Sequence, residues 1–145
     1  IGEFGIYYFP VTADGQSFTV AVRSNSTISG FKFTQDLKEI SFITSGSSNT
    51  VGYSNVTFLS SLLGGDFSVR IDDSSVEFTL KKNSTHTSIY IDYTHSTTPR
   101  TVKITGTIVI PEFPGIHLIL TTILAVALSY VIFSKAGKIK CMRSQ

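Results

Sequence analysis

Three of the four asparagines in this 145-residue chain begin the tripeptide Asn-x-Ser/Thr, at Asn25, Asn55 and Asn83. On exported proteins this tripeptide accepts N-linked glycans, which are bulky and lie on exposed surface. Asn25 and Asn83 stand beside residues typical of turns, whereas Asn55 is flanked by residues typical of a strand. The sequence therefore predicts a glycoprotein, with Asn25 and Asn83 better placed as acceptors than Asn55.

Neither the histidines nor the paired acids predict a metal site. His86 and His95 are nine residues apart at the ends of an expected strand, about 30 Å if it is fully extended, so they cannot share a zinc ion with its converging ligands. We expect both to form surface hydrogen bonds. Asp72 and Asp73, with Asp66 nearby, offer fewer oxygens than calcium gathers, so a type I or I′ turn is expected there. We predict no metal and no cofactor.

The chain carries no signature of an enzyme. It has no Gly-x-Ser-x-Gly motif, which exposes the nucleophile of many hydrolases, and no serine has a convincing partner base. The single cysteine, Cys141, stands in the basic C-terminal tail. Glycoside hydrolysis needs two carboxyl groups at a fixed separation in a cleft, for which a small sandwich has little room. We predict that the protein is not an enzyme and has no catalytic residue.

Apolar residues alternate with polar ones through most of the chain, a period of two that predicts strands. The residues on the expected inward side are Phe18, Val20, Val22, Phe31, Phe33, Ile40, Phe42, Phe67, Val69, Ile71, Val76, Phe78, Leu80, Ile89, Ile91, Tyr93, Val102, Ile104 and Ile108. Turn-forming residues, among them Asp14-Gly15 and Asp72-Asp73, separate these runs at intervals of about ten residues. We expect seven or eight strands in an antiparallel β-sandwich, immunoglobulin-like in size, whose last strand runs from Val102 to Ile110. Residues 59–63 are the one expected helical turn.

Tyr7, Tyr8, Tyr53 and Tyr90 have two possible uses. They offer an exposed contact surface that stacks on carbohydrate, because tyrosine combines apolar area with a polar group. The other use, which we favour, is packing between neighbouring strands.

Residues 116–133 form an uncharged, mostly apolar run of 18 residues. As a helix this run covers about 27 Å, close to the roughly 30 Å hydrocarbon core of a bilayer. Pro111 and Pro114 suit the first turn of such a helix. Four basic residues and no acidic one follow it, namely Lys135, Lys138, Lys140 and Arg143, and such an excess stays on the cytoplasmic side. We predict an extracellular domain at 1–112, a transmembrane helix at 113–134 and a cytoplasmic tail at 135–145.

The charge distribution supports this division and excludes nucleic acid as a partner. Residues 1–112 hold 8 Lys and Arg against 10 Asp and Glu, a net charge of −2, whereas residues 113–145 hold 4 against none. The outer domain therefore lacks the basic excess that phosphate contacts require. Because the chain begins with Ile1 and not Met, we expect a processed or partial chain.

The motif Pro111-Glu112-Phe113-Pro114, followed by an apolar helix and a basic cluster, resembles the PEF-type C-terminal signal of archaeal surface proteins. The resemblance covers about residues 110–143 and implies recognition by a membrane-embedded archaeosortase, which cleaves near the motif and exchanges the helix for a lipid anchor. Other archaeal surface proteins with a similar motif keep the helix. The basic residues of this chain are more spread out than in the tightest form of the signal, so a plain anchor and a processed one both stay open.

Residues 17–112 are also similar to a β-rich segment of archaeal secreted proteins of unassigned function. The resemblance is carried by Asn55-Val56-Thr57, by residues 61–65 and 83–90, and by Tyr93-Thr94-His95-Ser96. It implies a surface module that recurs next to membrane anchors, and it brings no binding residues with it.

Together these features predict a membrane-anchored, glycosylated archaeal cell-surface protein with a structural or adhesive role. Its expected partners are the lipid bilayer, an archaeosortase, and other surface-layer or adhesion proteins or glycans. The alternative is a membrane-proximal spacer, or a ligand-binding and carbohydrate-binding module, of a larger exported receptor or enzyme.

Overall fold

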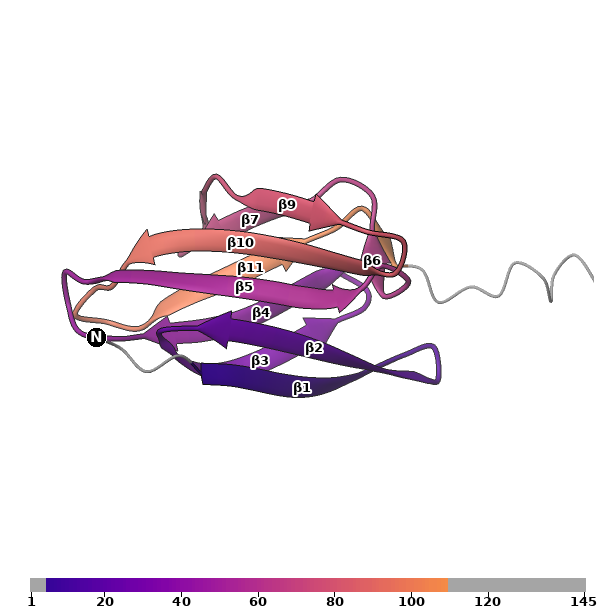
Figure 1. The fold of residues 1–145 in the computed structure, drawn as a ribbon, viewed down its shortest axis with the longest axis horizontal. Coiled ribbons are helices and arrows are strands. Elements are labelled where there is room, and N and C mark those ends of the chain that lie inside the picture. Colours follow the sequence, from indigo (N-terminus) through magenta and orange to yellow (C-terminus); the bar gives the residue numbers. More distant parts are fainter. Residues whose placement is uncertain (1–4, 110–145) are drawn as a thin grey trace, which may run out of the picture. The chain divides into compact units, whose positions relative to one another are not determined.

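The computed structural model describes residues 5–109. Most of their strands, whose side chains alternate between the two faces of a sheet, form two five-stranded antiparallel sheets (Figure 1). Sheet 1 has the order β1 (Gly5–Ala13), β2 (Gln16–Ser24), β5 (Val51–Leu59), β10 (His86–Thr94) and β9 (Thr79–Lys82). Sheet 2 has the order β3 (Thr27–Thr34), β4 (Glu39–Ser45), β11 (Arg100–Thr105), β7 (Ser68–Ile71) and β8 (Ser74–Ser75). A two-stranded sheet pairs β6 (Leu63–Gly64) with β12 (Ile108–Val109). The predicted all-β antiparallel architecture is confirmed for the described residues.

The core lies between the two large sheets, as in a β-sandwich. In Figure 1, sheet 1 runs across the front and the strands of sheet 2 lie behind it. The predicted inward side is confirmed along β2, β4, β7, β10 and β11, where every second residue is buried. The largest side chains that are almost completely buried are Phe42, Phe58, Ile40, Leu62, Leu63, Ile71, Ile89, Ile91 and Ile104. Burial of apolar area at about 25 cal/mol per Å² makes this layer the main stabilising feature of the domain.

Two of the predicted turns are tight hairpins. Asp14 and Gly15 join β1 to β2 with φ angles of 45° and 76°, and Asp72 and Asp73 join β7 to β8 with φ angles of 50° and 66°. Positive φ at both central positions defines a type I′ turn, whose twist matches that of the flanking strands. Gly adopts this conformation without steric cost and Asp tolerates it.

The described structure corrects three sequence-based expectations. Residues 76–78 belong to no strand, and Leu80 in β9 is 41% exposed where burial was expected. The expected last strand is divided, because Gly106 N donates to Lys38 O and Thr107 N to Gly64 O, which carries the chain from sheet 2 to β6. Ile108 is 50% exposed. Residues 59–63 hold a hydrogen-bonded turn from Leu62 N to Leu59 O, and no helix.

The predicted anchor lies outside the described residues. These undescribed residues include the motif Pro111-Glu112-Phe113-Pro114, the run 116–133 and the basic residues Lys135, Lys138, Lys140 and Arg143. Within residues 5–109 there is no helix long and apolar enough to cross a bilayer.

Candidate functional site

The side of sheet 1 that points away from sheet 2, here called the outer face, carries a set of polar and aromatic side chains. Strand register places them in two neighbouring rows. One row is Tyr8, Ala21, Thr57, Ser88 and Lys81, and the next is Ile6, Arg23, Asn55, Tyr90 and Thr79. Because neighbouring strands are about 4.8 Å apart, adjacent members of a row can contact the same small ligand.

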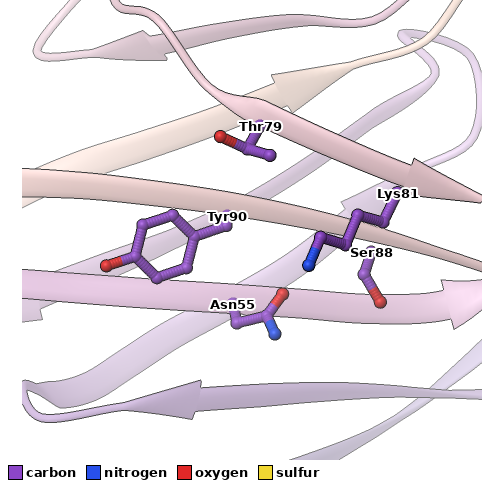
Figure 2. Close-up of a pocket in the computed structure, with 5 residues that line it drawn as sticks. All are labelled: Asn55, Thr79, Lys81, Ser88 and Tyr90. Atoms are coloured by element: carbon purple, nitrogen blue, oxygen red, sulfur yellow. The ribbon is translucent and has the colours of Figure 1, made fainter.

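A groove of about 270 Å³ lies on this face, lined by Asn55, Thr79, Lys81, Ser88 and Tyr90 (Figure 2). The five residues come from β5, β9 and β10. An adjoining hollow of about 230 Å³ shares Thr79 and Tyr90 with the groove and is also lined by Glu77, Phe78 and Asp92. Small-molecule sites usually occupy about 300–1,000 Å³, so the groove has room for a compact group such as one sugar ring.

Asn55 lies in the middle of β5 and has an unused side-chain amide. Its Oδ1 is buried and has no hydrogen-bond donor among the described residues. An unsatisfied buried polar group costs about 1–3 kcal/mol, and such atoms are rare in folded proteins. The neighbouring Thr57 and Ser88 hydroxyls are bonded to each other at 2.9 Å. Because Asn55 Oδ1 is covered by protein atoms, a ligand in the groove reaches this oxygen only after the side chain rotates.

The aromatic residue of the groove, Tyr90, stacks on Tyr53. The rings of Tyr53 and Tyr90 lie 5.8 Å apart at an interplanar angle of 21°, and Tyr90 is 41% exposed. Tyr8 is also on the outer face and is 67% exposed. Tyr7 points the other way, stacks on Phe9 and donates to Ser26 O at 3.4 Å. The favoured cross-strand packing is thus seen at Tyr53 and Tyr90, and Tyr7 is not part of an exposed surface.

The groove contains an unpaired positive charge. Lys81 forms no ion pair within residues 5–109, and neither does Arg23, which stands beside Asn55 in its row. The ion pairs of this part of the chain join Asp72 to Arg100 at 3.0 Å and Asp73 to Lys103 at 3.2 Å, on sheet 2. Arg23 thus lies beside Asn55 in the same row, and Lys81 lies beyond β10 in the neighbouring row.

The acidic pair Asp72 and Asp73 has a structural use. The Thr101 N–H donates to the Asp72 carboxylate, and this bond, followed by Arg100, lowers the pKa of Asp72 below its ordinary value. Asp66 is held elsewhere, where its N–H donates to Thr107 Oγ1. Within the described range, no three His, Cys, Asp or Glu side chains converge to hold a metal ion.

The two histidines differ in environment. His86 is exposed and its Nδ1 bonds with Thr85 Oγ1 at 2.8 Å, as expected of a surface residue. His95 is only 5% exposed, so the prediction of a surface position was wrong for this residue. Its Nε2 lies 2.8 Å from Ser26 Oγ and its Nδ1 lies 2.8 Å from Thr50 Oγ1.

His95 belongs to a chain of hydrogen bonds, here called the His95 network, which comprises the buried residues Ser24, Ser26, Ser54, Tyr93 and His95 and the exposed Thr50. Tyr93 Oη lies 2.8 Å from Ser26 Oγ and 2.9 Å from Ser54 Oγ. Ser54 Oγ in turn bonds with Ser24 Oγ at 3.2 Å. Two glycines make the space, because a Cβ at Gly46 would lie 2.5 Å from His95 Nε2 and one at Gly52 would lie 2.6 Å from the Tyr93 ring.

The three Asn-x-Ser/Thr sites have different surroundings. Asn83 is exposed, and its Oδ1 accepts from Thr85 N, Thr85 Oγ1 and His86 N at 2.9, 3.2 and 2.7 Å, while its Nδ2 forms no hydrogen bond with any described residue. Asn25 uses its whole amide, with Nδ2 donating to Val51 O and Oδ1 accepting from Tyr53 N. Asn55 lies in the groove. Geometry thus presents Asn83 best.

Comparison with protein-family models, with curated proteins and with solved structures found no significant match to this chain.

Proposed function

We propose that this chain is a membrane-anchored cell-surface protein whose β-sandwich is an adhesive domain, and that the domain contacts its partner through the outer face of sheet 1. The observation that carries the proposal is the groove around Asn55. It is lined by Asn55, whose buried Oδ1 has no donor among the described residues, by the exposed Tyr90, and by Lys81, which forms no ion pair within residues 5–109. Such a mixture of one aromatic surface and a few convergent polar groups is typical of a binding site.

The anchoring part of the proposal is supported by the sequence beyond the described residues. The apolar run 116–133 has the length of a bilayer-spanning helix, and the basic residues after it favour a cytoplasmic C-terminus. The Pro111-Glu112-Phe113-Pro114 motif supports a PEF-type signal of an archaeal surface protein. The proposal holds whether an archaeosortase exchanges the helix for a lipid or the helix is kept, because the domain stays outside in both cases.

We further assign Asn83 as the principal glycan acceptor. Its amide nitrogen is unengaged, and the Thr85 hydroxyl two residues on is already bonded to its side-chain oxygen. Asn83 lies in the turn between β9 and β10 and does not line the groove.

The test is a topology and adhesion experiment on an archaeal host that produces the full chain. External protease is expected to destroy an epitope in the 46–50 loop of intact cells while an epitope after Arg143 survives, or is absent if the tail has been removed. Cells with the chain are expected to adhere to one another or to a surface-layer preparation more than matched cells without it. Protection of the 46–50 epitope, or equal adhesion of both cell lines, would contradict the proposal.

A further inference from the structure

We propose that the groove binds an anionic glycan: a sugar ring lies against Tyr90, sugar hydroxyls pair with the Asn55 amide, and a carboxylate or sulfate group pairs with Lys81. This inference rests on the adhesive role of the outer face and names the chemical class of its partner. Three independent features of the groove lead to it.

The first feature is the unused amide. Asn55 stands at a central position of the sheet between β2 and β10, yet its buried Oδ1 has no hydrogen-bond donor within residues 5–109. A side chain that only supported the strands would be expected to satisfy this atom. A sugar hydroxyl both donates and accepts, so one or two of them can satisfy an asparagine amide, which has both kinds of atom.

The second feature is the arrangement of charge. Figure 2 shows the Lys81 amine reaching inward over the groove, between Tyr90 and Ser88 in that view. Glu77 and Asp92 line only the adjoining hollow, on the far side of Tyr90 and Thr79. The positive and negative groups are thus at opposite ends, which orients a ligand with its anionic group toward Lys81. A charge-assisted hydrogen bond of this kind is stronger than a neutral one.

The third feature is the aromatic surface. Tyr90 exposes part of its ring and is held in place by stacking on Tyr53. A rigid tyrosine provides contact area at little cost in conformational entropy. The groove therefore offers a sugar one apolar surface, one amide and one cation, all from strands of a single sheet.

Asn55 also begins an Asn-x-Ser/Thr tripeptide, so the groove has a rival occupant. A glycan attached to Asn55 Nδ2 would fill the groove with the protein's own sugar and prevent ligand binding there. The occupancy of Asn55 in protein from its glycosylating host therefore decides between the two, and the expected result is an unmodified Asn55.

Binding is tested with the full chain, made without N-glycosylation and held in detergent micelles. The probes are an oligogalacturonate, a sulfated dextran oligosaccharide and a neutral dextran oligosaccharide of similar length. At least one anionic probe is expected to bind about tenfold more tightly than the neutral probe, which corresponds to one charge-assisted contact. The two anionic probes distinguish carboxylate from sulfate as the source of the charge, and raising the salt concentration is expected to weaken binding.

Variants locate the site. Lys81→Met and Tyr90→Ala are each expected to weaken binding about tenfold. Lys82→Met is the matched control for Lys81, because Lys82 is the next residue of β9 and points to the other side, over the Phe67 ring. Tyr8→Ala is the control for Tyr90, because it lies on the outer face but does not line the groove. Thermal denaturation of each variant confirms that the fold is retained.

The inference would be overturned if the neutral probe bound as tightly as the anionic probes, or if Lys82→Met weakened binding as much as Lys81→Met. A glycan on Asn55 would also overturn it. If no probe binds while cell adhesion still depends on Tyr90, the anionic glycan is wrong and the adhesive face stands. If cells with and without the chain adhere equally, the proposed function itself fails, whatever the probes do.

Discussion

His95 Nε2 lies 2.8 Å from Ser26 Oγ, and this hydrogen bond joins two connections through which the chain crosses from sheet 1 to sheet 2. Ser26 follows β2 and precedes β3, while His95 follows β10 and precedes β11. The other ring nitrogen bonds with Thr50, just before β5. One imidazole thus connects three chain segments that are far apart in the sequence, at the end of the core where apolar packing gives way to polar side chains.

Replacing His95 by alanine is expected to lower the free energy of unfolding by about 2–4 kcal/mol, because it leaves the buried Ser26 hydroxyl short of a partner and opens a cavity. Urea denaturation of the full chain in micelles measures this, with tyrosine fluorescence as the signal because the chain has no tryptophan. His86→Ala is the matched control and should change stability by at most about 0.5 kcal/mol. Equal effects of the two substitutions would contradict a structural role for the His95 network.

Gly52→Ala is expected to destabilise the domain by about 1–3 kcal/mol, since the added methyl group overpacks a filled interior. The new Cβ would lie 2.6 Å from the Tyr93 ring and 2.7 Å from His95. Ser75→Ala is the control, because it places alanine at an exposed strand position in β8, where the new methyl group meets no filled interior. The same denaturation experiment applies, and a Gly52→Ala protein as stable as wild type would show that the His95 network is looser than described.

Asp72 is expected to make stability depend on pH at the acidic end. Because its folded-state pKa is lowered from the ordinary value of 3.8, its contribution is present above that value and is lost as the pH falls through the lower folded-state pKa. Asp72→Asn keeps a residue that tolerates positive φ but removes the charge. It should therefore reduce stability at pH 7, by less than about 1 kcal/mol for so exposed a group, and the deficit should shrink toward pH 3. Asp36→Asn controls for the change in net charge, and a deficit that grows on acidification would have the wrong sign.

Peptide mapping of protein from the archaeal host tests the three glycan sites. Occupancy is expected to be highest at Asn83, whose amide nitrogen is unengaged, and lower at Asn25, whose amide bridges Val51 and Tyr53. Thr85→Ala should abolish the modification at Asn83, whereas Thr85→Ser should retain it. Greater occupancy at Asn25 than at Asn83 would show that the host modifies the chain before these hydrogen bonds form.

The strands and turns could be predicted from the sequence because they depend on neighbouring residues. Phe18, Val20 and Val22 alternate with Thr19, Ala21 and Arg23 and are buried, and Asp14-Gly15 forms the expected turn. The division of the last expected strand could not be predicted. It depends on two hydrogen bonds with residues far away in the sequence. Gly106 N donates to Lys38 O, and Thr107 N donates to Gly64 O.

The candidate site could be predicted only in part, for the same reason. Tyr53 and Tyr90 are two of the four tyrosines that the sequence indicates as candidates for a contact surface, but the groove exists because the registers of β5, β9 and β10 bring Asn55, Lys81 and Tyr90 together. Asn55 was ranked as a weak glycan acceptor, and no local pattern marks its amide as unused. The burial of His95 has a faint signal in the sequence, since Gly46 and Gly52 stand on either side of Thr50 and leave room for a ring.

Adhesion of cells that display the full chain measures whether the groove on the outer face of sheet 1 holds cells to their partner. Four matched lines are compared: wild type, the double variant Lys81→Met/Tyr90→Ala, the control Lys82→Met/Tyr8→Ala, and cells without the chain. Equal surface amounts are verified with an antibody to the 46–50 loop. We expect wild type and the control to adhere, while adhesion of the groove variant falls to the level of cells without the chain. Full adhesion by the groove variant would contradict an adhesive role for the outer face of sheet 1.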